Sequence, residues 1–142
     1  MFVKQLTVFI ENRVGSLEEV TKKLTEHDVN IFSISLADTS EYGLLRMIVS
    51  DPEKGKKVLQ DNDFSAMLTD VIAVRLENKV GTLEKLFHTV SESGVAVEYM
   101  YAMATSKTGA MILKTSDAAK AVKVLEAAGM ILLDEAAMYQ IP

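Results

Sequence analysis

The sequence predicts an α+β protein in which two βαββαβ units follow one another, each an antiparallel sheet with both helices on one face. Three features indicate this fold: a duplication that runs through the whole chain, alternating apolar residues typical of strands, and apolar residues at helical spacing. At 142 residues, 49% of them hydrophobic, the chain is long enough to fold without disulfides or a structural metal.

The duplication is clearest in one short segment. Glu11–Glu18, with the sequence ENRVGSLE, recurs as Glu77–Glu84, with the sequence ENKVGTLE, 66 positions later. The same offset places Gly43 on Gly109 without an insertion. Because the unit occurs twice, the chain is a tandem pair and not a solenoid.

Strands are predicted where apolar residues alternate. The strand before each Glu-Asn turn is indicated by Leu6, Val8 and Ile10 in the first copy and by Ile72, Val74 and Leu76 in the second. Further strands are expected over residues 30–37, 44–49, 64–70 and 130–140, with a hairpin turn over 38–43. The resulting order is the ferredoxin-like arrangement.

Two helices are predicted in each unit. The first follows the turn, with Ser16 as its N-cap and Glu19 completing a capping box, and Lys85 replaces that carboxylate in the second copy, which should weaken the helix start. The helical periodicity is carried by Leu17, Val20 and Leu24, and by Leu83, Leu86 and Val90. The second helices are expected after Asp51-Pro52 and after Asp117.

The two units are expected to be domains of residues 1–69 and 70–142, with their antiparallel sheets packed as a pair. Residues 64–76 contain no flexible linker, so the domains should be held in a fixed relation. The strand around residues 96–103 is apolar on both faces, and such a surface is usually covered. We therefore expect a homodimer.

The composition excludes several function classes. Without cysteine there are no disulfides, thiolate zinc sites or cysteine nucleophiles. A net charge of -5 argues against nucleic acid as a partner. The absence of a signal sequence or a long apolar run argues against a membrane and favours the cytoplasm. We expect no cofactor and no metal, since His27 and His88 occupy non-equivalent positions.

The turn before each first helix carries the strongest chemical signal. Gly15 and Gly81 allow a ligand to approach the backbone, and the free N–H groups at a helix start favour a carboxylate. Asn12 and Asn78 add an amide that can meet either charged group of an amino acid. The alternative is that Asn and Gly are simply good turn residues.

These residues resemble the ACT domain family. The pattern Asn-x-x-Gly-x-Leu after an apolar strand, followed by His27-Asp28-Val29-Asn30-Ile31, is similar to that family over essentially the whole chain, twice. The resemblance implies small regulatory modules that hold an amino acid at a domain junction. In serine-binding members two asparagines contact the effector, and these correspond to Asn12 and Asn30 in the first unit.

The second unit departs from this pattern, because Ala96 stands where the first unit has Asn30. A histidine of the serine-binding members is Ile10 or Leu76 here, which argues against serine. The family's usual proline is Val14 or Val80. The predicted ligand-binding residues are Asn12, Arg13, Val14, Gly15, Ser16, Leu17, Asn30, Asn78, Lys79, Val80, Gly81, Thr82 and Leu83, with no catalytic residues.

The sequence thus predicts a non-catalytic regulatory protein with an amino acid effector, acting on an enzyme or regulator of amino acid metabolism. One alternative is a pure dimerisation or protein-interaction module with no small ligand. A second is a small phosphatase on the same architecture, with Arg13 in the phosphate loop. Lys79 at the equivalent position and the lack of a nucleophile or base pattern argue against catalysis.

Overall fold

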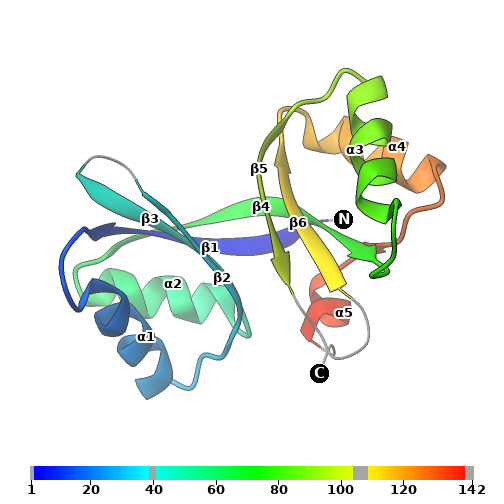
Figure 1. The fold of residues 1–142 in the computed structure, drawn as a ribbon. Coiled ribbons are helices and arrows are strands. Elements are labelled where there is room, and N and C mark those ends of the chain that lie inside the picture. The colour runs from blue at the N-terminus through cyan, green and yellow to red at the C-terminus, as the bar shows by residue number, and fades with distance from the viewer. Residues whose placement is uncertain (1, 39–40, 104–108, 140–142) are drawn as a thin grey trace. The chain divides into compact units, whose positions relative to one another are not determined.

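The computed structural model describes residues 2–38, 41–103 and 109–139. The chain divides into two compact units, one of Lys4–Thr69 and one of Asp70–Pro142 together with Met1–Val3. Figure 1 shows the helices of residues 16–26 and 52–61 together on one face of the first unit's strands, and those of residues 82–92 and 118–127 together on one face of the second unit's strands. The predicted domain limits, 1–69 and 70–142, stay a prediction, and each unit is described separately.

The first unit has the predicted βαββαβ order. Its elements are β1 (Val3–Glu11), α1 (Ser16–Glu26), β2 (Ile31–Asp38), β3 (Tyr42–Val49), α2 (Pro52–Asp61) and the first part of β4 (Ser65–Leu76). The strands lie in the order β2-β3-β1-β4. β1 and β3 are antiparallel, with Ile10 opposite Gly43, and β2 and β3 are antiparallel, with Leu36 opposite Leu45.

The core of the first unit lies between its sheet and its helices. The alternation seen in the sequence places Leu6, Val8 and Ile10 on the side that faces α1 and α2. Val20 and Leu24 of α1 are fully buried against them. Because α1 carries its apolar residues on a single stripe, this stripe fixes which side of its N-terminal turn faces the sheet.

The second unit repeats the arrangement. Its elements are the rest of β4, α3 (Thr82–Glu92), β5 (Val97–Met103), β6 (Gly109–Thr115), α4 (Ala118–Ala127), β7 (Leu132–Leu133) and α5 (Glu135–Tyr139). β4 lies between β6 and β7, and β5 is on the far side of β6. Its core includes Ile72, Val74, Leu86, Val90, Leu113 and Leu125. The predicted α+β class, with an antiparallel βαββαβ sheet in each unit, is confirmed.

The second helices begin where the sequence indicates. The Asp51 carboxylate accepts a hydrogen bond from the Lys54 N–H at 3.1 Å, and Pro52 occupies the first turn. Asp117 accepts from the Lys120 N–H at the same distance. Both aspartates are therefore N-caps, which satisfy donors that the helix leaves free.

Two predictions about these elements are wrong. Ser16 is not an N-cap, because Gly15 holds that position and Ser16 is the first helical residue, so no capping box forms with Glu19. The long final strand is also absent from the described residues. After the two residues of β7 the Asp134 carboxylate accepts from the Ala137 N–H at 2.8 Å and starts α5, while Gln140 lies outside the described residues.

Candidate ligand grooves beside the first helices

The turn between β1 and α1 has a backbone geometry that only glycine adopts readily. Gly15 has a φ of 89°, in the left-handed region, and its carbonyl accepts the first helical hydrogen bond from the Glu19 N–H at 3.0 Å. A tight turn precedes it, in which the Ser16 N–H donates to the Arg13 carbonyl at 3.3 Å. The turn therefore ends β1 and starts α1 within four residues, Asn12 to Gly15.

This turn leaves backbone donors unused. Within the described part of the chain, the N–H groups of Val14, Gly15, Leu17 and Glu18 have no acceptor. They lie at the positive end of the α1 dipole, where an anion is stabilised. Three of these four residues, Val14, Gly15 and Leu17, were predicted from the sequence as ligand-binding residues.

The Ser16 hydroxyl lies beside these donors and has no partner either. The residue is only 5% exposed, and its Oγ makes no hydrogen bond to the residues that the structure describes. A buried hydroxyl without a partner is rare, since leaving it unsatisfied costs about 1–3 kcal/mol. Ser16 is also one of the residues that line the groove described below.

Arg13 is held by carboxylates of its own unit. Its guanidinium contacts Glu19 at 2.9 Å and Glu11 at 3.1 Å. The hydrogen bonds to Glu19 and then to Glu11 raise the pKa of Arg13 above its ordinary value. Since both ion pairs are exposed to solvent, they add little stability, but they direct the guanidinium towards protein carboxylates.

Asn12 is tied to the end of β2. Its Nδ2 donates to Asp38 Oδ1 at 2.8 Å. Asn12 and Leu36 come close to each other over Gly43, where an added Cβ would lie 3.0 Å from Leu36 Cδ1 and 3.3 Å from Asn12 Oδ1. Gly43 thus provides the space in which Leu36 and Asn12 approach each other.

Together these groups line an open groove of about 620 Å³ in the first unit. Its lining residues are Ile10, Glu11, Asn12, Arg13, Val14, Gly15, Ser16, Leu17, Glu18 and Leu36. This size lies within the usual range for small-molecule sites, about 300–1,000 Å³. The groove combines backbone donors on one wall with aliphatic side chains on the other.

Asn30 does not line this groove. It precedes β2 at the end where Ile31 faces Val49, whereas Asn12 follows the opposite end of β1. The two asparagines are separated by the length of the strand, about 25 Å at about 3.3 Å per residue. The Asn30 N–H instead donates to the Ser50 hydroxyl at 2.9 Å.

The second unit repeats the backbone but changes the side chains. Gly81 has a φ of 92° and its carbonyl accepts from the Lys85 N–H at 3.0 Å. Among the described residues, acceptors are again lacking for the N–H groups of Val80, Gly81, Leu83 and Glu84. The Thr82 Oγ1 is also buried without a partner. The turn of the second unit is therefore built like the first.

The groove of the second unit has a different lining. It measures about 460 Å³ and is lined by Arg75, Leu76, Glu77, Lys79, Val80, Gly81, Thr82, Lys85, Gly129, Met130 and Ile131. Lys79 pairs with Glu77 at 3.0 Å, and this hydrogen bond lowers the pKa of Glu77 below its ordinary value. Asn78, although predicted as a ligand-binding residue, is not among the lining residues.

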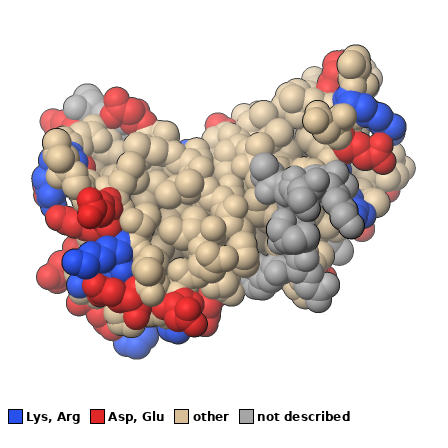
Figure 2. Space-filling view, turned by 60° about the horizontal axis from the view of Figure 1, so that its bottom comes forward, with Lys and Arg blue, Asp and Glu red and all other residues tan. Residues whose placement is uncertain are grey.

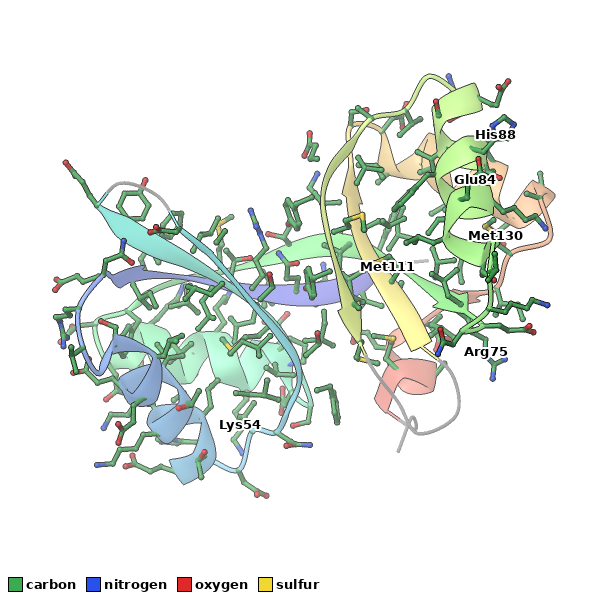
Figure 3. All side chains as sticks on the ribbon, viewed as in Figure 1. Lys54, Arg75, Glu84, His88, Met111 and Met130 are labelled. Carbon is green, nitrogen blue, oxygen red and sulfur yellow. The ribbon has the colours of Figure 1, made fainter. Side chains whose placement is uncertain are left out.

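The two histidines lie apart from each other in the sequence and on different helices. In the described ranges no group of three His, Asp or Glu side chains is placed to hold a metal ion. His27 Nδ1 lies 2.9 Å from the Lys23 carbonyl at the end of α1, and His88 projects from the exposed side of α3 near Glu92 (Figure 3). His27 is therefore the C-cap residue of α1, and His88 is exposed to solvent.

Charged side chains of both signs are visible on the surface. On the face drawn in Figure 2 they gather towards the edges of the view, acidic next to basic, without a broad basic patch among the residues in colour. Over the described residues, no helix is long and apolar enough to cross a membrane.

Sequence reasoning missed Asp38 and Leu36. It placed Asp38 in the hairpin turn, whereas the structure continues β2 to Asp38, so that Leu36 and Asp38 lie on the same side of the strand. Period-2 counting from Ile34 through Leu36 would have placed Asp38 on that side.

A family model described as an ACT domain pair matches residues 1–141. The chain belongs to the ACT domain pair family. An ACT domain pair is a regulatory type of domain, and the family resemblance noted in the sequence is confirmed.

Solved structures agree with this family. A protein from Bacteroides thetaiotaomicron is 36% identical, with a TM-score of 0.93, and the match covers 99% of this ACT domain pair and 98% of that chain. The regulatory subunit of aspartate kinase from Thermus thermophilus is 17% identical, with a TM-score of 0.64 and coverage of 88% and 91%, so it shows the shared fold. No curated protein shows significant similarity to the chain.

Proposed function

We propose that this ACT domain pair is a non-catalytic sensor that binds a free α-amino acid in the groove beside α1 and transmits the binding to another protein. The observation that carries this proposal is the set of four N–H groups at the start of α1, which have no acceptor among the described residues and whose residues line the groove, beside the buried, unpartnered Ser16 hydroxyl. A carboxylate is the group that best satisfies such donors, since it accepts several hydrogen bonds and is favoured at a helix start.

In this proposal the ligand carboxylate binds Ser16 and the N–H groups around Val14 to Leu17. The ammonium group lies towards Asn12, whose Nδ2 is already bonded to Asp38. Arg13 contributes to the shape of the turn and not to anion binding, because Glu19 and Glu11 hold its guanidinium. Binding would favour one conformation over another by the difference in ligand affinity between them.

The proposal is tested by a thermal shift screen of the full chain with each standard amino acid. A ligand that binds the native state raises its stability by about 2.7 kcal/mol at a hundredfold excess over Kd. Asn12→Ala should reduce the shift, and the repeat-related Asn78→Ala is the matched control because Asn78 lines neither of the two grooves described above. If the ligand raises the melting temperature of Asn12→Ala as much as that of the wild type, Asn12 is not a ligand-binding residue.

The alternative is an interaction module with no small ligand. In that case no amino acid would shift the melting temperature, and titration calorimetry would show no heat of binding. If none of the amino acids raises the melting temperature, or none gives a heat of binding, the sensor proposal is rejected and the interaction module is favoured.

The proposal also includes a homodimer, a location in the cytoplasm and a partner that is an enzyme or regulator of amino acid metabolism. Support for the dimer comes from β5, where Met100 is 39% exposed on a strand with few polar residues. An exposed apolar strand of this kind favours association with another surface. Light scattering on the purified chain should give twice the monomer mass.

A further inference from the structure

The walls of the first groove differ in chemistry, and this difference bears on which amino acid fits. One wall is formed by the start of α1, with its free N–H groups and the Ser16 hydroxyl. The other includes Leu36 of β2, which is 50% exposed; Asp38, two residues further along the strand, is exposed but does not line the groove. A ligand between the two walls would meet donors on one side and aliphatic groups on the other, with the Asp38 carboxylate beyond them.

We propose that the first groove selects an α-amino acid with an uncharged aliphatic side chain, and that Asp38 binds its ammonium group. This inference rests on the proposed function and adds to it the ligand class and a residue that recognises it. The carboxylate binds at Ser16, the ammonium binds at Asp38, and the side chain lies on Leu17 and Leu36.

Asp38 is suited to this role by its position and its charge. Asn12, which lines the groove, donates to one of its carboxylate oxygens at 2.8 Å, so this hydrogen bond ties the Asp38 carboxylate to a lining residue. An ion pair with an ammonium group is stronger than the hydrogen bond an amide oxygen offers, because the acceptor is charged. At the repeat offset the counterpart of Asp38 in the second copy is Ala104, so this carboxylate belongs to the first unit alone.

The aliphatic surface of the groove points to the side chain of the ligand. Ile10, Val14, Leu17 and Leu36 are four of its lining residues. Leu17 is 40% exposed and Leu36 is 50% exposed, so both have apolar surface that a ligand can cover. Covering such surface favours binding in proportion to the area removed from water.

The charges of the groove disfavour an acidic side chain. Arg13 is the basic residue among the lining residues, and its guanidinium is held by Glu19 and Glu11. Glu11 and Glu18 also line the groove and would repel a second carboxylate. A basic side chain is the competing class, because Glu18 could pair with it, and the experiment therefore includes lysine.

The experiment is titration calorimetry of the full chain with leucine, valine, alanine, serine, aspartate and lysine, and with the 2-oxo acid of leucine, which lacks the ammonium group. Leucine should bind at least about tenfold more tightly than alanine, since filling an apolar pocket discriminates in that range. Asp38→Asn should weaken leucine binding about tenfold or more and leave binding of the oxo acid unchanged.

A matched pair of variants tests the aliphatic wall. Leu36→Ala should weaken leucine binding and reduce the preference for leucine over alanine, whereas Ile34→Ala should change neither. Ile34 is an appropriate control because it lies on the same side of β2, is 48% exposed and does not line the groove. Circular dichroism melts of both variants show whether they fold equally well.

The outcomes separate this inference from the proposed function. If serine, aspartate or lysine binds more tightly than leucine, or if Asp38→Asn leaves leucine binding unchanged, the ligand class or the role of Asp38 is overturned and the sensor proposal stands. If no amino acid binds, both proposals are overturned together.

Discussion

Replacing Ser16 with alanine tests the proposed site through two effects of opposite sign. The Ser16 Oγ is buried and unpartnered in the free protein, so its removal should stabilise the fold. The same oxygen is proposed to donate to the ligand carboxylate, so its removal should weaken binding. A residue with a purely structural role would not produce both effects.

The magnitude follows from the burial of this hydroxyl. A buried hydroxyl without a partner lowers the free energy of unfolding by about 1–3 kcal/mol. Deleting it also removes a few packing contacts, each of which contributes about 0.1–0.2 kcal/mol. The free energy of unfolding of Ser16→Ala should therefore rise by about 1 kcal/mol, or about 4–8 °C in melting temperature for a unit of this size. Loss of one ligand hydrogen bond, about 0.5–1.5 kcal/mol, should weaken amino acid binding about two- to twelvefold.

The assay is urea unfolding of wild type and Ser16→Ala, each with and without the best amino acid from the screen. Thr115→Val is the matched control, because Thr115 is 2% exposed, its Oγ1 is also unpartnered, and it lies in β6 outside both grooves. It should stabilise the free protein without changing ligand affinity. A destabilised Ser16→Ala, or one whose affinity equals that of the wild type, would refute the reasoning.

Three further predictions concern the stability of the fold and the ionisation of Glu77. Gly15→Ala should destabilise the first unit by about 1 kcal/mol in urea unfolding, because its left-handed φ disfavours a side chain although the space for one is open. Asp51→Ala and Asp117→Ala should each cost about 1 kcal/mol through loss of an N-cap, measured by the same unfolding curves. Lys79→Ala should raise the pKa of Glu77, measured by an NMR titration. In the folded wild type that pKa is lowered, so the ion pair with Lys79 stabilises the fold at pH values above the ordinary pKa of Glu77. This stabilisation is lost as the pH falls through the pKa that Glu77 has in the folded protein.

Local patterns in the sequence were enough to predict most of the elements. Alternation identified β1 and the second part of β4, and the Asp-Pro pair identified the start of α2, because these signals depend on residues close together in the chain. The capping box was predicted wrongly because Ser16 followed by Glu19 fits the motif, and the competing effect of a left-handed Gly15 at the N-cap became evident only in the backbone geometry.

The candidate site was predicted only in part, for a related reason. The turn residues Asn12 to Leu17 are contiguous and duplicated, so the sequence indicated them directly. Leu36 and Asp38 reach the turn through the pairing of β2 with β3 and of β3 with β1. A contact that depends on the register of three strands is hard to predict from a single sequence. A shift of one residue in the pairing of two strands would move every side chain of the shifted strand to the opposite face of the sheet.

The two copies differ in a way that bears on how the pair works. The backbone of the turn is nearly the same in both, with φ values of 89° and 92° at Gly15 and Gly81. The side chains around it diverge, since Lys85 replaces Glu19 and Ala102 replaces Leu36. Backbone N–H groups can donate to any carboxylate, whereas side chains distinguish one carboxylate ligand from another. The duplication has therefore kept the general anion-binding turn and changed the part that selects, so amino acid binding should be unequal in the two units and strongest in the first.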